Sequence, residues 1–245
     1  APGLSARGRA GCPAAASAAV AIRAMDLLLL GFGKMNHLVA EMAGERGHRV
    51  AKTLDQGDAW PAGWTAGLVA IDFSIPSAVL PHAEQCMLAG IPLVIGTTGW
   101  YEHMDQVRAL VDSAAVGAIY GANFSVGVQA FYRAVQAAAA ALPADYEAFV
   151  WEAHHRHKLD APSGTAREVA ARLLAAGHPA AVASTRAGSL PGVHTVGFDA
   201  PEDTLTITHT ARSMRGFAAG ALWAAEWIRG RRGLHEFSSA WEQKI

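Results

Sequence analysis

The side chains best suited to acid–base chemistry lie in a single run between Trp151 and Thr165. Histidine exchanges a proton near neutral pH, and lysine can bind a carboxylate or act as an acid. The segment Pro162-Ser163-Gly164-Thr165 is typical of a helix start, where a hydroxyl and free N–H groups bind anions. The run therefore predicts a site for an acidic small molecule. Its reactive members are His154, His155, His157, Lys158, Ser163 and Thr165.

Each part of this run also has a structural interpretation. The histidines could be solvated side chains, and Ser163-Gly164-Thr165 could serve only as a helix cap. The three histidines have no Cys or carboxylate at ligand spacing, so we expect no metal.

The bulk properties are those of a soluble globular protein. The 245 residues are 51% hydrophobic and 17% charged, with a net charge of −1. This balance provides neither a broad basic face for nucleic acid nor a polybasic membrane anchor, and no apolar run is long enough to span a bilayer. Two cysteines, Cys12 and Cys86, do not make a disulfide framework, so a cytoplasmic location is expected.

Residues 1–24 differ in composition from the rest, being rich in Ala and Gly with three arginines and no acid. This composition is similar to that of a transit peptide. We favour an upstream extension with the natural start at Met25, since the first expected strand follows at once. The extension is expected to be poorly ordered and without a role in function.

A strand at Asp26–Leu30, a Gly-x-Gly turn, a helix and a second strand at His48–Leu54 predict a dinucleotide-binding unit. The cofactor-binding run is Gly31-Phe32-Gly33-Lys34-Met35-Asn36. Asn36 stands where a third glycine is usual, so we expect a slightly displaced helix or a more loosely held pyrophosphate. At the end of the second strand, Lys52 favours a 2′-phosphate and Asp55 a ribose hydroxyl, which leaves the choice between NADPH and NADH open.

The remaining pattern predicts an α/β fold with a Rossmann-like parallel sheet and a second α+β domain with an open mixed sheet. The expected further strands are 68–73, 92–95, 116–120, 146–153, 182–186, 193–198 and 204–211. The expected further helices are 77–89, 101–114, 128–142, 166–176 and 218–229, with a loop at 55–67.

Five motifs in order give the chain a resemblance to the 4-hydroxy-tetrahydrodipicolinate reductase (dihydrodipicolinate reductase) family. The longest is Glu-x-His-His-x-x-Lys-x-Asp-x-Pro-Ser-Gly-Thr-Ala, beginning at Glu152. The others are Asp72-Phe73-Ser74-Ile75-Pro76, Gly96-Thr97-Thr98-Gly99, Gly121-Ala122-Asn123-Phe124-Ser125 and the segment 209–221. Met214 departs from the family, which usually has Arg there; either Arg212 or Arg215 substitutes for that arginine, or its role is lost.

The resemblance implies NADPH- or NADH-dependent reduction of a small cyclic dicarboxylate, formed from 4-hydroxy-tetrahydrodipicolinate, to tetrahydrodipicolinate. By motif position, His154 is the general acid/base and Lys158 a proton donor. The expected substrate-binding residues are His155, Ser163, Gly164, Thr165 and Thr98. The expected cofactor-binding residues beyond the glycine turn are Phe73, Gly96, Thr97, Thr98, Gly121, Ala122, Asn123 and Phe124.

The resemblance also implies a homotetramer built on the open sheet. The cofactor domain would comprise residues 25–123 and 216–245, and the substrate and oligomerisation domain residues 124–215. Two alternatives stay open. One is a different nicotinamide-dependent dehydrogenase on the same fold, and the other is a catalytically silent NAD(P)-binding paralogue.

Overall fold

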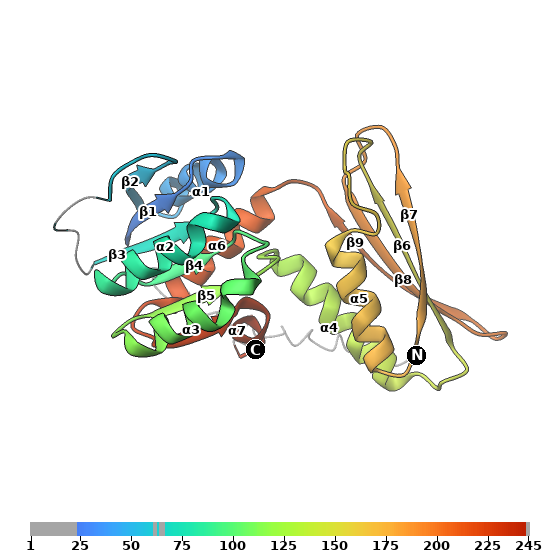
Figure 1. The fold of residues 1–245 in the computed structure, drawn as a ribbon. Coiled ribbons are helices and arrows are strands. Elements are labelled where there is room, and N and C mark those ends of the chain that lie inside the picture. The colour runs from blue at the N-terminus through green and yellow to red at the C-terminus, as the bar shows by residue number, and fades with distance from the viewer. Residues whose placement is uncertain (1–23, 61–62, 64–66, 244–245) are drawn as a thin grey trace, which may run out of the picture.

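The chain folds around two separate sheets in the computed structural model, which describes residues 24–60, 63 and 67–243 (Figure 1). The expectations for residues 1–23 and for part of the 55–67 loop lie outside these ranges. The expected fold class, a Rossmann-like parallel sheet with a second mixed sheet, is confirmed.

The first sheet is parallel throughout, with strand order β10-β5-β4-β3-β1-β2. Strand β1, between β3 and the edge strand β2, consists largely of leucines that are fully buried, as expected for a parallel strand covered on both faces. The strands are β1 (Asp26–Leu30), β2 (Arg49–Leu54), β3 (Leu68–Asp72), β4 (Leu93–Ile95), β5 (Gly117–Tyr120) and β10 (Gly233–Glu236).

Helices cover both faces of this sheet. One apolar cluster joins β1 and β3 to α1, α6 and α7, and a second joins the opposite face to α2 and α3. The helices are α1 (Lys34–Glu45), α2 (Pro76–Leu88), α3 (Met104–Ser113), α6 (Arg215–Ile228) and α7 (Phe237–Glu242), with a 3-10 turn η1 (Tyr101–His103) before α3.

The second sheet is mixed, with order β7-β6-β8-β9 and a parallel pairing only between β6 and β7. Helices α4 (Val126–Ala141) and α5 (Gly164–Ala175) pack on one face of it (Figure 1). In the described part of the chain no helix covers the other face. The strands are β6 (Glu147–His154), β7 (Ala180–Arg186), β8 (Gly192–Asp199) and β9 (Thr204–Ala211).

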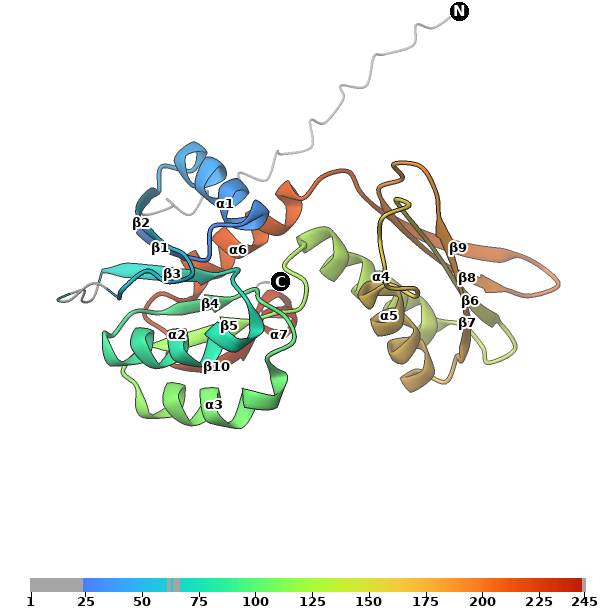
Figure 2. The ribbon, with the colours of Figure 1, turned by 45° about the horizontal axis from the view of Figure 1, so that its top comes forward.

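The chain passes between the sheets twice, before α4 and before α6, so that α6 returns to the first sheet (Figure 2). Arg215, at the start of α6, binds Glu41 and Glu45 of α1 and fixes the second crossing. None of the described helices has both the length and the apolar character needed to cross a membrane.

The end of the chain differs from the sequence-based expectation, which stopped at the helix over 218–229. The chain continues into β10, which pairs with β5 at the edge of the first sheet, and into α7, whose Phe237 is fully buried. Both elements are short, and β10 has no fully buried residue, so neither has a strong periodic signal.

Candidate active site

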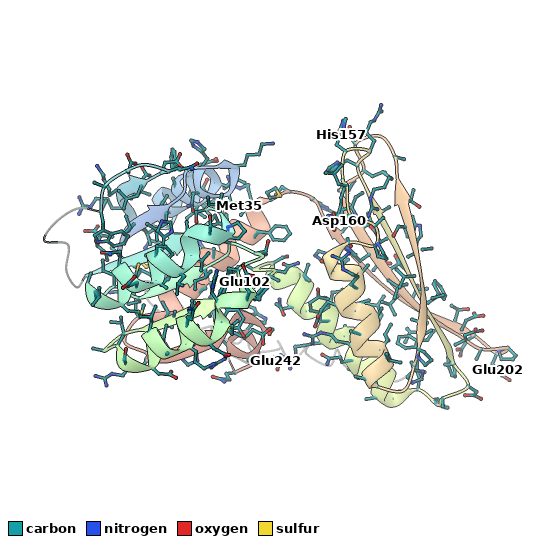
Figure 3. All side chains as sticks on the ribbon, viewed as in Figure 1. Met35, Glu102, His157, Asp160, Glu202 and Glu242 are labelled. Carbon is teal, nitrogen blue, oxygen red and sulfur yellow. The ribbon has the colours of Figure 1, made fainter. Side chains whose placement is uncertain are left out.

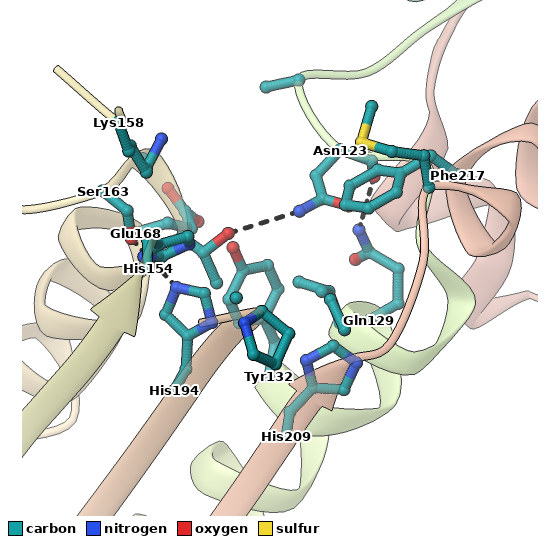
Figure 4. Close-up of a pocket in the computed structure, with 18 of the residues that line it drawn as sticks. Asn123, Gln129, Tyr132, His154, Lys158, Ser163, Glu168, His194, His209 and Phe217 are labelled. Atoms are coloured by element: carbon teal, nitrogen blue, oxygen red, sulfur yellow. Dashed lines mark hydrogen bonds between the residues drawn. The ribbon is translucent and has the colours of Figure 1, made fainter. Parts of the chain in front are cut away.

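A cleft of about 1110 Å³ lies between the two sheets (Figure 4). Thr98, Gly121, Ala122 and Asn123 line it from the carboxyl ends of β4 and β5. All the expected catalytic and substrate-binding residues of the signature run line it from the second sheet. These are His154, His155, Lys158, Ser163, Gly164 and Thr165.

The N-terminus of α5 opens into this cleft. Ser163 is the N-cap, and its hydroxyl accepts a hydrogen bond from the N–H of Ala166 at 3.3 Å. The N–H groups of Gly164 and Thr165 lie in the first helical turn, which leaves them without intrahelical acceptors. Asn123 reaches across the cleft and donates to the Thr165 hydroxyl at 3.3 Å (Figure 4). The helix start therefore presents free donors next to a residue of the first sheet.

His154 lies at the end of β6 and is partly buried. Its Nδ1 is 2.5 Å from a carboxylate oxygen of Glu152, a side chain with no exposed surface. Burial lowers the pKa of His154, and Lys158 and Arg186 add to this, while Glu152 opposes it. The imidazole is therefore neutral near pH 7.

Lys158 follows in the loop after β6, and its Nζ donates to Asp160 at 2.7 Å. The lysine lowers the pKa of the Asp160 carboxyl. By contrast, His157 does not line the cleft and lies at the outer tip of this loop (Figure 3). Two of the three clustered histidines thus share the cleft, and the third is a surface residue.

His194 on β8 is a site residue that the sequence analysis missed. It is 4% exposed, its Nε2 is 2.9 Å from the Ser163 hydroxyl, and its ring packs edge-on against His154. Burial lowers the pKa of His194 to about 4, with His154 adding to the effect. A neutral His194 thus holds the N-cap of α5.

Of the three clustered histidines, only His154 joins a possible ligand group: one ligand atom each of Glu152, His154 and His194 lies within 4.8 Å of the others. Arg186, however, donates to both oxygens of Glu152, at 2.9 and 2.7 Å. A cation placed here would lie against this guanidinium. The donor set therefore fits a metal poorly, and the expectation of no metal stays a prediction.

The glycine turn after β1 has the form of a phosphate cradle. Gly31 has φ +76°, and a Cβ there would lie 2.7 Å from the Phe73 carbonyl oxygen. Gly33 is the N-cap of α1 without any side-chain cap, and space around it is open. The uncapped helix start and the open Gly33 fit the pyrophosphate of a dinucleotide.

Asn36 bridges α1 and the end of β1 through its side chain, and the expected displacement of the helix or looser hold on the pyrophosphate stays a prediction. Asn36 is fully buried, and its amide nitrogen lies 3.0 and 2.6 Å from the carbonyl oxygens of Leu30 and Gly31. The side chain therefore ties α1 to the end of β1.

The two loops beside this turn are joined through Asp72. Its buried carboxylate accepts from the Ser74 N–H and hydroxyl, at 2.9 and 2.6 Å, and from the Thr97 hydroxyl at 2.8 Å. His82 lies 2.8 Å from the other oxygen. Phe73 packs directly on Gly96, where a Cβ would lie 2.1 Å from the ring.

Several expected cofactor-binding residues lie at this edge of the first sheet but outside the cleft lining. They are Gly31, Phe32, Gly33, Lys34, Met35, Asn36, Phe73, Gly96, Thr97 and Phe124. Phe124 is 1% exposed as a whole residue and its ring packs against Phe237, so in this structure it belongs to the core beneath the cleft.

Of the two arginines near Met214, only Arg212 lines the cleft, together with Met214 itself. Arg215 is bound to α1. Arg212 is thus the arginine placed to substitute for the usual one. Other cleft residues that sequence reasoning missed include Gln129, Tyr132, Glu168, Arg172, His209 and Phe217. They come from α4, α5, β9 and α6; His209 and Phe217 lie in the motif segment 209–221 without an assigned role, and no local motif marks the other four.

Comparisons with known proteins lead to the same family as the sequence motifs. Two family models match, "Dihydrodipicolinate reductase, N-terminus" over residues 58–124 and "Dihydrodipicolinate reductase, C-terminus" over residues 127–240. A 4-hydroxy-tetrahydrodipicolinate reductase of Christiangramia forsetii is 34% identical over 86% of this chain and 95% of that protein. The enzyme of that name from Neisseria meningitidis is 36% identical over 69% of this chain and 70% of its own.

Solved structures share the fold. Dipicolinate-bound dihydrodipicolinate reductase from Paenisporosarcina sp. TG-14 superimposes with a TM-score of 0.73 at 21% identity, covering 87% of this chain and 98% of that one. An oxidoreductase from Thermotoga maritima does so with a TM-score of 0.57 at 9% identity, covering 86% and 90%. The motifs, the family models and the relatives agree: the chain belongs to the dihydrodipicolinate reductase family of NAD(P)H-dependent oxidoreductases.

Proposed function

We propose that this chain reduces the cyclic imine formed from 4-hydroxy-tetrahydrodipicolinate to tetrahydrodipicolinate, a step of diaminopimelate and lysine biosynthesis. The observation that carries the proposal is the cleft, which places His154, Lys158 and the α5 N-terminus opposite the carboxyl ends of β4 and β5. In a sheet of this type the nicotinamide cofactor binds at those strand ends. The proposed division is a cofactor domain of residues 25–123 and 216–245 and a substrate domain of residues 124–215.

The substrate carries two carboxylates, and the cleft offers matching donors. The N–H groups of Gly164 and Thr165 and the hydroxyl of Thr165 form one anion site at the start of α5. Thr98 and Asn123 face this site from the first sheet. Lys158, which pairs with Asp160, can exchange that carboxylate for one of the substrate, and His155 lies beside it. These residues hold and orient the ring.

The imine forms when 4-hydroxy-tetrahydrodipicolinate loses its 4-hydroxyl group as water, and the reduction then adds a hydride and a proton to this imine. NADH or NADPH supplies the hydride when bound, so the chain must position the ring and donate or accept protons. In our proposal His154 is the general acid/base, acting through the Nε2 that the Glu152 contact leaves free. Lys158 delivers a proton from the same loop.

In our proposal the carboxyl end of β2 favours NADH over NADPH. Gly31 donates its N–H to the Leu54 carbonyl at 2.7 Å, so Asp55 is the next residue beside the glycine turn. Asp58 lies close to it, since its carboxylate accepts from the Asp55 N–H at 2.8 Å. Lys52 pairs with Leu28, further back along the strand. Two carboxylates here repel a 2′-phosphate and accept from ribose hydroxyls.

The proposed oligomer is a homotetramer assembled on the uncovered face of the second sheet. This face carries Phe149 and Trp151, 38% and 40% exposed, and the hydrogen-bonded pair Thr195 and Thr208. Large exposed aromatic residues on a flat sheet mark a surface that associates. The free thiol of buried Cys86 suits a reducing compartment, and the cytoplasm is the location that we propose.

The test is oxidation of NADH and, separately, NADPH at 340 nm, with substrate generated from pyruvate and aspartate semialdehyde by a coupling synthase. We expect turnover that depends on the synthase and is faster with NADH. His154→Ala and Lys158→Ala should each lower turnover at least about a hundredfold. His157→Ala is the matched control and should keep normal turnover, since His157 lies outside the cleft. Near-normal rates in both cleft variants would contradict the assigned roles.

The alternative activity is that of another nicotinamide-dependent dehydrogenase, because more distant oxidoreductases share this fold. A panel of imine and amino-acid substrates separates the two. Cofactor binding without any turnover would indicate the silent paralogue.

A further inference from the structure

Glu152 is a carboxylate buried in the middle of the second sheet, and several of its hydrogen bonds lead to parts of the site. Its side chain has no exposed surface. Arg186 donates to both of its oxygens, His154 Nδ1 lies 2.5 Å from Oε2, and the Ser163 N–H donates to Oε1 at 3.3 Å. Arg186 in turn donates to the Asp160 carbonyl at 2.6 Å. The buried ion pair of Glu152 and Arg186 thus connects the His154 imidazole, the N-cap of α5 and the loop after β6 that carries Lys158.

The charge on Glu152 decides which nitrogen of His154 carries the proton. Burial would raise the pKa of Glu152, but hydrogen bonds from Arg186, Ser184 and His154 outweigh it and lower the pKa to about 2. An ionised carboxylate has only acceptors, so the nitrogen of His154 that faces it must be the donor. The proton of the neutral ring therefore sits on Nδ1, and Nε2 keeps a free lone pair on the side of Gly192, which lines the cleft.

Strand pairing places Arg186 where it can keep Glu152 ionised. It lies opposite His154 in the parallel register of β6 and β7, on the strand next to Glu152. An isolated buried carboxylate would take up a proton, and a protonated Glu152 could instead donate to the imidazole. The guanidinium, which binds both oxygens, keeps Glu152 ionised and fixes its plane.

We propose that Glu152 and Arg186 are positioning residues for His154, which hold it as the Nδ1–H tautomer and aim Nε2 into the cleft. Neither residue lines the cleft, so neither touches the substrate. The kinetic part of this inference rests on the proposed function, whereas the tautomer is a property of the protein alone. The charged and titratable groups around His154 are Glu152 on its own strand, Lys158 in the loop, Arg186 on β7 and His194 on β8.

The test compares Glu152→Gln with the wild type and with Glu147→Gln, which changes an exposed glutamate of the same strand. The tautomer is read from nitrogen NMR of histidine-labelled protein, with the His154 signals assigned by His154→Gln. We expect Nδ1–H in the wild type and in Glu147→Gln, and a shift toward Nε2–H in Glu152→Gln, since the glutamine amide can donate to Nδ1.

In kinetics, we expect kcat of Glu152→Gln to fall about 10- to 100-fold, as for other groups that orient an imidazole, with KM and the NADH Kd within about threefold. In the plot of kcat against pH, the limb that follows the titration of His154 should move to lower pH, because the carboxylate that stabilises the protonated imidazole is lost. A merely structural glutamate would not move that limb or the tautomer.

Glu152→Asp keeps the charge but shortens the reach, so it should retain Nδ1–H while losing part of kcat, and it replaces Glu152→Gln if the latter fails to fold. An unchanged tautomer in Glu152→Gln, or wild-type kcat in either variant, would overturn the proposal. If no variant and no wild-type protein reduces the dipicolinate-type imine, the proposed function fails, and the tautomer still decides the role of Glu152.

Discussion

His194 is a buried histidine that the fold holds neutral, and this makes the stability of the protein depend on pH. Its pKa is lowered to about 4 by burial, with the nearby His154 adding to the effect, whereas an unfolded chain has the ordinary value of about 6.5. Between these two values the unfolded state binds more protons, so the free energy of unfolding falls as the pH falls. The contribution of His194 is complete above about pH 6.5 and is lost progressively toward pH 4.

The size of the effect follows from the two pKa values. Between about pH 7.5 and about pH 5, protonation of His194 in the unfolded chain lowers the free energy of unfolding by about 2 kcal/mol. His194→Gln removes the titration and leaves an amide that can still reach the Ser163 hydroxyl, which lies 2.9 Å from Nε2 in the wild type. We therefore expect the wild type to lose about 2 kcal/mol more than His194→Gln over this pH interval.

Urea unfolding followed by tryptophan fluorescence measures this difference. Both proteins must be compared at one concentration, because association of subunits adds to apparent stability. His154 and His209 also have lowered pKa values, but both proteins contain them, so the comparison isolates the part of the pH dependence that requires His194, including its coupling to these two histidines. Equal losses in wild type and variant would refute the reasoning and would mean that folding does not lower the pKa of His194.

Two other predictions concern the glycine turn and the open sheet. Gly31→Ala should lower the free energy of unfolding by about 1–3 kcal/mol, because φ is +76° and a Cβ would meet the Phe73 carbonyl, whereas Gly33→Ala should leave stability nearly unchanged and weaken NADH binding. Urea unfolding measures the stability and fluorescence titration measures the NADH binding. An equal loss of stability in the two variants would contradict the different roles given to the two glycines. Trp151→Glu should yield smaller species in sedimentation velocity, while Leu174→Glu, on the exposed side of α5, should not; an unchanged oligomer in Trp151→Glu would exclude the open sheet face as the interface.

The parts of the site that the residues alone could predict each lie within one contiguous segment, whereas the expectation for Thr98 and Asn123 came from the family resemblance. His154, Lys158 and Ser163 are linked by a single loop, and a Ser-Gly-Thr helix start requires no distant partner. The glycine turn is equally local, because β1, the turn and α1 follow one another along the chain. A buried strand and an amphipathic helix each have a periodic signal that survives without tertiary information.

The parts that could not be predicted depend on pairings between distant segments. Arg186 and His194 reach the site only through β7 and β8, and nothing near them in sequence indicates a partner. The role of Asn36 as a bridge to Leu30 and Gly31 depends on how closely α1 approaches β1. Strand β10 was missed because a four-residue edge strand has too few residues to show a pattern.

The register of the second sheet is therefore the feature on which the chemistry depends. Strand β6 has a parallel neighbour on one side and an antiparallel one on the other, and Glu152 lies directly opposite His194 while His154 lies opposite Arg186. Because side chains alternate between the faces of a strand, a slip of one residue in either pairing would turn Arg186 or His194 to the outer face. Glu152 would then be a buried carboxylate without its cation, or Ser163 would lose its imidazole partner. Substitutions that disturb this register, even far from the cleft, should lower turnover through the orientation of His154, while cofactor binding, which depends on the first sheet, persists.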